Sequence, residues 1–155
     1  MRLKVCGIRE HQNAIELAGL KPEWMGFIFY PHSSRYFLDA KQPVNIASID
    51  SSIQKVGVFV DEEPEKLKDI QIRYSLDLIQ LHGNESPDYC KNLKASGLNL
   101  IKAFPVKNES DLNGTDVYLP YIDYLLFDTM GPQPGGNGRH FDWALLSGKR
   151  FGKPF

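Results

Sequence analysis

The sequence contains little cysteine, no excess charge of either sign and no long apolar run. Its two cysteines, Cys6 and Cys90, are far apart in 155 residues and do not form a disulfide framework, which indicates a reducing compartment. A net charge of −1 excludes the basic excess that nonspecific nucleic-acid binding requires. The apolar run at the N-terminus is too short for a signal peptide, and no later run could span a membrane. We therefore expect a cytoplasmic protein with neither nucleic acid nor a membrane as its partner.

The remaining composition is that of an ordinary globular protein. Hydrophobic residues make up 42% of the chain and charged residues 24%. The length is that of one domain with a sizeable core, so residues 1–155 are expected to form a single domain.

Short apolar segments alternate with helical patterns along the chain. Strands are predicted at 3–8, 24–30, 55–60, 76–81, 98–104 and 124–127, with a further strand beginning at 153–155. Helices are predicted at 9–20, 41–49, 64–74, 86–97, 108–116 and 141–149. Gly19 is expected to end the first helix in the left-handed conformation. This alternation predicts an α/β fold, with a parallel sheet covered by helices.

Two parallel architectures fit this pattern, an open doubly wound sheet and a (β/α)8 TIM barrel. An open sheet that binds nucleotides carries a glycine-rich first turn, and Gly7 is the only glycine in that turn here. A barrel instead draws its functional side chains from the ends of many strands. Candidate residues do fall at or just beyond several predicted strand ends, namely Cys6, Arg35, Gln80, His82 and Asp128. The barrel is therefore favoured.

A complete barrel needs eight strand–helix units, whereas the pattern supplies about six and the start of a seventh. We therefore expect a barrel truncated after about six units, with strands seven and eight absent from this chain. Open sheet edges favour self-association, so a homo-oligomer is one expected state. Fusion of the parent protein to another enzyme is a second arrangement that these residues leave open.

Asp128 and Cys6 are the candidates for proton transfer. Asp128 ends an apolar strand, whose burial would raise the pKa of the carboxyl and suit a general acid. Its alternative role is that of a capping carboxylate. Cys6 could act as a nucleophile or base in its thiolate form, or it could simply pack in the core.

Three further features could bind a substrate. Arg35 could hold a carboxylate or phosphate with two hydrogen bonds, or it could be an ordinary surface arginine. His82 could transfer protons or line the rim of a pocket. The run Gly135-Gly136-Asn137-Gly138 lacks the Lys-Ser/Thr pair of a phosphate-binding P-loop and is interpreted as the hinge of a lid. No cluster has the spacing of metal ligands, so we expect no metal.

Taken together, these segments resemble the phosphoribosylanthranilate isomerase family. The resemblance runs from residue 3 to residue 155, with the motifs in the family's order. The motifs are Lys4-Val5-Cys6-Gly7-Ile8, Gly26-Phe27-Ile28-Phe29-Tyr30-Pro31-His32-Ser33-Ser34-Arg35-Tyr36, Val56-Gly57-Val58-Phe59-Val60, Gln80-Leu81-His82-Gly83, Ile101-Lys102-Ala103-Phe104, and Asp128 with Gly135-Gly136-Asn137-Gly138-Arg139-His140-Phe141-Asp142-Trp143.

The resemblance implies a cofactor-free barrel enzyme of tryptophan biosynthesis. Its reaction is the Amadori rearrangement of N-(5-phosphoribosyl)anthranilate to 1-(2-carboxyphenylamino)-1-deoxyribulose 5-phosphate. By matching motifs, Cys6 would be the general base and Asp128 the general acid. The other implied contacts with the phosphosugar substrate are Arg35 at the anthranilate carboxylate, Gln80 and His82 along the pocket, and Gly135 and Gly136 in a loop from 129 to 140 that closes over the ligand.

Two other functions fit the same residues. One is a different cofactor-free phosphosugar enzyme built on a barrel, and the other is a noncatalytic partial barrel that self-associates. Because the family binds the substrate phosphate with loops after strands seven and eight, we expect a chain ending at Phe155 to bind substrate weakly and to turn over slowly.

Overall fold

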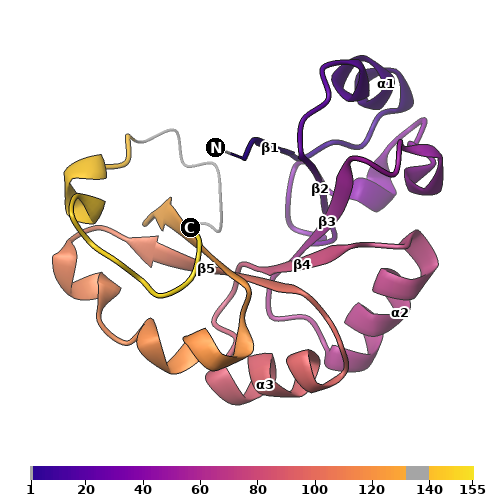
Figure 1. Cartoon of the computed structure of the whole chain (residues 1–155). Helices are drawn as coiled ribbons and strands as arrows, with labels where there is room; N and C mark the ends of the chain where they lie inside the picture. Colours follow the sequence, from indigo (N-terminus) through magenta and orange to yellow (C-terminus); the bar gives the residue numbers. More distant parts are fainter. Residues whose placement is uncertain (1, 132–139) are drawn as a thin grey trace. The chain divides into compact units, whose positions relative to one another are not determined.

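In the computed structural model, which describes residues 2–131 and 140–155, the chain forms two compact units, Met1–Ile79 and Gln80–Phe155 (Figure 1). The elements of the first unit are β1 (Lys4–Cys6), α1 (His11–Gly19), β2 (Trp24–Ile28), the 3-10 helices η1 (Phe37–Asp39) and η2 (Ile46–Ser48), β3 (Gln54–Phe59) and α2 (Pro64–Tyr74). The second unit begins within β4 (Leu78–Leu81) and continues with α3 (Pro87–Ala95), β5 (Leu100–Val106), η3 (Glu109–Leu112), η4 (Asp116–Tyr121), β6 (Tyr124–Thr129) and η5 (Trp143–Leu146). The six strands lie at the six predicted positions.

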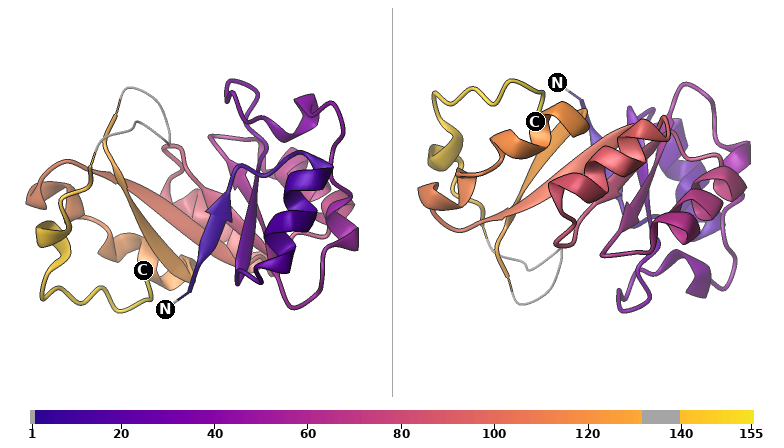
Figure 2. Two further views of the ribbon diagram at one scale, coloured as in Figure 1. Left: turned by 90° about the horizontal axis from the view of Figure 1, so that it is seen from above. Right: turned by 90° about the horizontal axis from the view of Figure 1, so that it is seen from below.

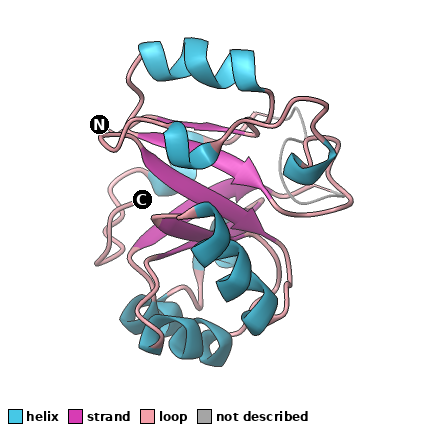
Figure 3. Cartoon of the chain, turned by 90° about the vertical axis from the view of Figure 1, so that its right-hand side faces the viewer, coloured by secondary structure: helices cyan, strands magenta, loops and turns pink. Residues whose placement is uncertain are grey.

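The strands of the first unit pair in parallel, in the order β1, β2, β3. Cys6 of β1 is in register with Gly26 of β2. Because side chains alternate along a strand, Met25 and Phe27 point to the face opposite Gly26, where both are fully buried. Helix α1 lies alongside these strands (Figure 2 and Figure 3). One face of this sheet is therefore core, and the other carries Cys6.

Aromatic side chains form the core of the first unit. Phe29 and Phe59 stack with their ring centroids 5.3 Å apart and their planes 13° from parallel. Phe37 packs edge-on against Phe27 at 5.6 Å and against Tyr74 at 5.5 Å. Such pairs add to the hydrophobic stabilisation of large buried rings. Tyr74 ends α2, so these contacts fix that helix against the sheet.

The second unit repeats the strand–helix pattern. Strands β5 and β6 pair in parallel, from Ile101 opposite Tyr124 to Val106 opposite Thr129. Helix α3 overlies the strands of this unit in the view from below (Figure 2). Val106, Leu112 and Leu146 form a buried cluster beneath the ends of these elements. Of the helices within the described ranges, none is long and apolar enough to cross a lipid bilayer.

The predicted starts of α2 and α3 are confirmed by their capping geometry. Pro64 occupies the first turn of α2, where its missing N–H leaves no intrahelical bond unmade. Ser86 accepts a hydrogen bond from the backbone N–H of Tyr89 at 3.2 Å, which satisfies a free donor at the start of α3. Gly97 follows α3 with φ +85°, the left-handed conformation that glycine adopts without strain.

The helix predicted at 41–49 is wrong. The segment forms only η2, after the preceding turn η1 at 37–39. Its first residues pair with the chain entering α1: the His11 N–H donates to the Gln42 carbonyl at 2.9 Å, and the Val44 N–H donates to the Arg9 carbonyl at 3.0 Å. These tertiary hydrogen bonds hold residues 42–44 extended, so the helical pattern is overridden.

Other local predictions also need correction. The helix predicted at 108–116 is replaced by η3 and η4, and the helix predicted at 141–149 shortens to η5. Residues 153–155 form no strand, although the Pro154 carbonyl accepts a hydrogen bond from the Leu125 N–H of β6 at 2.9 Å. Gly19 stays within α1, and Lys21, with φ +51°, takes the left-handed conformation instead.

Candidate active site

Cys6 and Arg35, which are 29 residues apart in the chain, lie together in the first unit. Arg35 Nη1 donates to the Cys6 carbonyl over 3.4 Å. Its side chain crosses Gly7, where an added Cβ would lie only 2.8 Å from both Cδ and Nη1 of Arg35. Gly7 has φ +89° and directly follows β1, so the turn requires glycine for its backbone as well as for space. The predicted base and the predicted anion-binding residue therefore share one edge of this unit.

Gly26 makes room for two functional groups beside it. A Cβ built at this position would lie 2.7 Å from Cys6 Sγ and 2.9 Å from Lys4 Nζ. Lys4 and Cys6 are two residues apart along β1, and their side chains therefore point to the same face of the sheet. The sulfur and the ammonium group thus occupy the volume above Gly26, with a positive charge placed beside the thiol.

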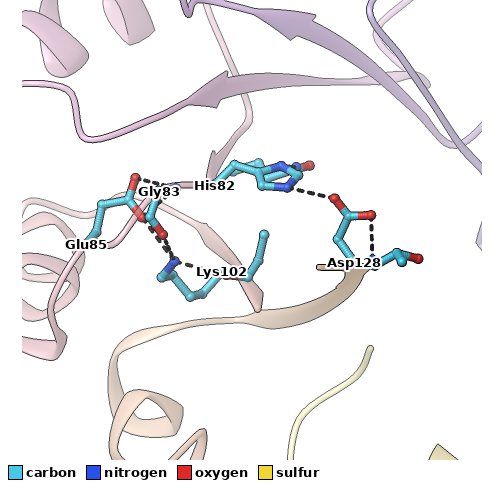
Figure 4. A network of polar contacts seen from close by, with 8 residues as sticks. His82, Gly83, Glu85, Lys102 and Asp128 are labelled. Carbon is cyan, nitrogen blue, oxygen red and sulfur yellow. Dashed lines mark hydrogen bonds and ion pairs between the residues drawn. The ribbon is translucent and has the colours of Figure 1, made fainter. Parts of the chain in front are cut away.

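In the second unit, Asp128 is held by two hydrogen bonds at the end of β6. Its Oδ2 lies 3.1 Å from His82 Nε2, and its Oδ1 accepts from the Thr129 N–H at 2.9 Å (Figure 4). On the other side of the ring, His82 Nδ1 lies 2.9 Å from Gln80 Nε2. The structure therefore joins three of the predicted residues, Gln80, His82 and Asp128, in one hydrogen-bond chain. Gln80 and His82 point to the same face because they are two residues apart along an extended segment.

The prediction that strand burial raises the pKa of Asp128 is wrong. The hydrogen bond from His82 lowers the pKa of this carboxyl below its ordinary value, and the His82 charge and the Thr129 N–H act in the same direction. Partial burial opposes them and is outweighed. Asp128 therefore rests as a carboxylate near neutral pH and must gain a proton before it can act as an acid.

A buried ion pair beside His82 went unpredicted. Lys102 Nζ lies 3.0 Å from Glu85 Oε2, and their side chains are 4% and 1% exposed (Figure 4). The Gly83 carbonyl accepts from Lys102 Nζ at 2.8 Å, and the Gly83 N–H donates to the Glu85 carboxylate at 3.0 Å. The residue after His82 is thus fixed through both of its backbone groups. The one sequence signal was Lys102 itself, a charge within an otherwise apolar strand.

Two predicted substrate contacts, Gly135 and Gly136, lie outside the described residues, as does most of the loop expected to close over the ligand. Within residues 2–131 and 140–155, no group of three or more His, Cys, Asp or Glu side chains is arranged to hold a metal ion.

Comparison with known proteins points to one family. Residues 3–154 match the family model described as N-(5'phosphoribosyl)anthranilate (PRA) isomerase. The N-(5'-phosphoribosyl)anthranilate isomerase of Parabacteroides distasonis is 44% identical over 100% of this chain and 71% of its own length.

Two solved structures extend the match to three dimensions. The phosphoribosyl anthranilate isomerase of Thermotoga maritima superposes with a TM-score of 0.80 at 34% identity, covering 94% of this chain and 70% of the other. A phosphoribosyl anthranilate isomerase in complex with reduced 1-(o-carboxyphenylamino)-1-deoxyribulose 5-phosphate superposes with a TM-score of 0.76 at 32% identity, covering 94% of this chain and 68% of the other. The likeness confirms the predicted α/β barrel class.

Proposed function

The chain belongs to the N-(5'-phosphoribosyl)anthranilate isomerase family, and from that premise we propose that Asp128 and Cys6 are its general acid and general base. The protein is an isomerase of tryptophan biosynthesis that acts on N-(5'-phosphoribosyl)anthranilate. The observation that carries the proposal is the position of Asp128 at the end of β6, half-buried and hydrogen-bonded to His82. The hydrogen bond fixes the orientation of the carboxyl group, and partial burial shields it from water, as a general acid requires.

The proposed reaction moves two protons. Asp128 gives its proton to the ring oxygen of the ribose, the bond from that oxygen to C1 breaks, and the nitrogen lone pair forms a protonated imine with C1. Cys6, as thiolate, then removes the hydrogen from C2 as a proton, which converts the protonated imine to a neutral enolamine. Tautomerisation of the enolamine gives the ketone, 1-(2-carboxyphenylamino)-1-deoxyribulose 5-phosphate. One step needs a group that donates a proton and the other a group that removes one. A carboxyl and a thiolate can do this without a cofactor.

The remaining site residues are proposed to bind the substrate. Arg35 is exposed and is anchored at Cys6, so its guanidinium can hold the anthranilate carboxylate next to the base. Gln80 and His82 would line the pocket near Asp128. Gly135 and Gly136 would belong to the loop that covers the bound ligand.

Loss of substrate fluorescence tests these roles. We expect the parent chain to consume freshly prepared N-(5'-phosphoribosyl)anthranilate, and Cys6→Ser and Asp128→Asn each to lower kcat by about 10²-fold or more. Asp69→Asn, at an exposed carboxylate on α2, is the matched control and should retain the parent rate. If Cys6→Ser and Asp128→Asn match the parent, the assigned roles are wrong. If the parent consumes no substrate, the activity itself is refuted for this chain.

We also propose that the enzyme works in the cytoplasm on a soluble phosphosugar. Both cysteines are free thiols, Cys6 partly exposed and Cys90 buried, as is usual for proteins kept in a reducing compartment. Thiol titration of protein purified without reductant tests this point. Two free thiols per chain are expected, and an intramolecular or intermolecular disulfide would contradict it.

A further inference from the structure

Gln80, His82 and Asp128 form a hydrogen-bond chain that runs from the buried interior of the second unit to its surface. Gln80 is 2% exposed, and the side chain of His82 is 17% exposed. Solvent therefore reaches the imidazole but not the amide behind it. The chain joins an amide, a ring that can carry one or two hydrogens, and a carboxylate, all within hydrogen-bond distance.

The Gln80 amide determines which nitrogen of His82 carries hydrogen. An amide NH2 group can only donate, and Gln80 Nε2 faces His82 Nδ1 at 2.9 Å. In this orientation of the amide Nδ1 accepts, and the hydrogen of a neutral ring is on Nε2. That hydrogen is donated to Asp128 Oδ2, which is a carboxylate oxygen in this state. This is the resting arrangement.

The oxygen of the same amide is buried and lacks a partner among the described residues. A half-turn of the amide plane exchanges its oxygen and nitrogen. Gln80 Oε1 would then face Nδ1 and accept a hydrogen from it, so that both nitrogens of His82 could carry hydrogen. One orientation of Gln80 thus suits a neutral ring with hydrogen on Nε2, and the other suits a ring with hydrogen on Nδ1, either as the imidazolium ion or as the other neutral tautomer.

Building on the proposed function, we propose that His82 loads onto Asp128 the proton that Asp128 gives to the substrate, and that the Gln80 amide permits this by turning over. A hydronium ion supplies the second hydrogen of the ring as the amide turns, and in the loaded state the imidazolium donates Nδ1–H to Gln80 Oε1 and Nε2–H to Asp128. Transfer of the Nε2 proton to Oδ2 leaves a neutral ring, with hydrogen on Nδ1, and a protonated carboxyl. After Asp128 has protonated the ring oxygen, a hydronium ion from solvent restores the proton on Nε2, and Cys6 releases to solvent the proton that it took from C2.

Among the charged groups near His82, Asp128 is the carboxylate that accepts from Nε2. Asp128 approaches from β6, and the Thr129 N–H occupies its other oxygen at 2.9 Å. Two further charged groups near this segment, among the described residues, are Glu85, which precedes α3, and Lys102 of β5, which form an ion pair at 3.0 Å. They hold the backbone of Gly83 rather than the ring.

Nuclear magnetic resonance of the whole chain, labelled with 15N in histidine and glutamine, tests the proton inventory without reference to activity. At pH 8.5 we expect neutral His82 with its hydrogen on Nε2. On acidification the Gln80 side-chain amide signals should shift with the same midpoint as the His82 ring. Gln80→Met, which removes donor and acceptor together, should shift neutral His82 toward a mixture of both tautomers. His11→Gln, at an exposed histidine in α1, is the matched control and should change neither behaviour.

Two results would overturn the inference: a neutral His82 with hydrogen on Nδ1, or Gln80 signals that ignore the titration of His82. A kinetic comparison supplies the second measurement. Because glutamine can donate to Asp128 but cannot carry an extra proton, His82→Gln should lower kcat by about 10²-fold with little change in KM. An unchanged kcat with a raised KM would limit His82 to the pocket-lining role of the proposed function and refute proton loading. An inactive parent chain would instead count against the proposed function, while the resonance experiment would still decide the state of Gln80.

Discussion

Replacing Lys102 by methionine is expected to destabilise the protein by about 3–5 kcal/mol, because it leaves the Glu85 carboxylate buried without its partner. In the native chain the two side chains are 4% and 1% exposed, so water cannot replace the lost ammonium group. Lys102 Nζ also donates to the carbonyls of Gly83 at 2.8 Å and Ala103 at 3.0 Å. Losing these bonds places the expected cost in the upper part of the range. With a urea dependence of about 2 kcal/mol/M, the unfolding midpoint followed by far-ultraviolet circular dichroism should fall by roughly 2 M.

Two further variants make this prediction specific. Lys68→Met breaks an ion pair of 2.8 Å whose side chains are 31% and 86% exposed, and should cost about 1 kcal/mol or less. The double variant Glu85→Gln/Lys102→Met removes both charges and should recover most of the loss, because no charge is then stranded. The reasoning fails if Lys102→Met costs no more than Lys68→Met, or if the double variant is as unstable as the single one.

Three other outcomes are expected. Gly26→Ala should cost about 1–3 kcal/mol in urea unfolding, because its Cβ would lie 2.7 Å from Cys6 Sγ; Gly19→Ala, with nothing within 4 Å, is the control and should be neutral or stabilising. Because folding lowers the pKa of Asp128, its stabilising contribution should be complete above about pH 4 and lost as the pH falls through the folded-state value. Asp128→Asn should therefore flatten the pH dependence of stability in that acidic range, and an unaltered dependence would contradict the argument. Ellman's reagent at pH 8 should label Cys6 in the native chain and spare Cys90, whose thiol is fully buried with its pKa raised by desolvation to about 11; equal labelling rates would refute this.

The elements that the sequence predicts well have a local cause. The six strands are short, mostly apolar runs, a local pattern that favours a strand packed against other elements. The starts of α2 and α3 depend on Pro64 and Ser86, whose effects act within one turn. Residues 42–44 were mispredicted because they hydrogen-bond to the chain before α1, a partner that periodicity cannot reveal.

The site residues show the same difference between features with a local cause and features that depend on tertiary contacts. That Asp128, His82 and Gln80 stand at strand ends follows from the pattern of the strands. That His82 lowers the pKa of Asp128 does not, because the two residues are 46 positions apart and their contact depends on the fold. The pairing of Glu85 with Lys102 was hidden for the same reason. Fold class and candidate residues were therefore predictable, whereas the protonation states and supporting contacts required coordinates.

Glu85 and Lys102 hold Gly83 through its N–H and its carbonyl, and this shared role should limit which substitutions the two positions accept. A change at position 85 or 102 alone would leave one charge buried without its partner, so we expect it to weaken folding. We therefore expect viable descendants to exchange both positions together or neither. In a library that randomises the two sites together, surviving clones should keep the acid–base couple or replace it with two uncharged residues, and the mixed combinations should be rare.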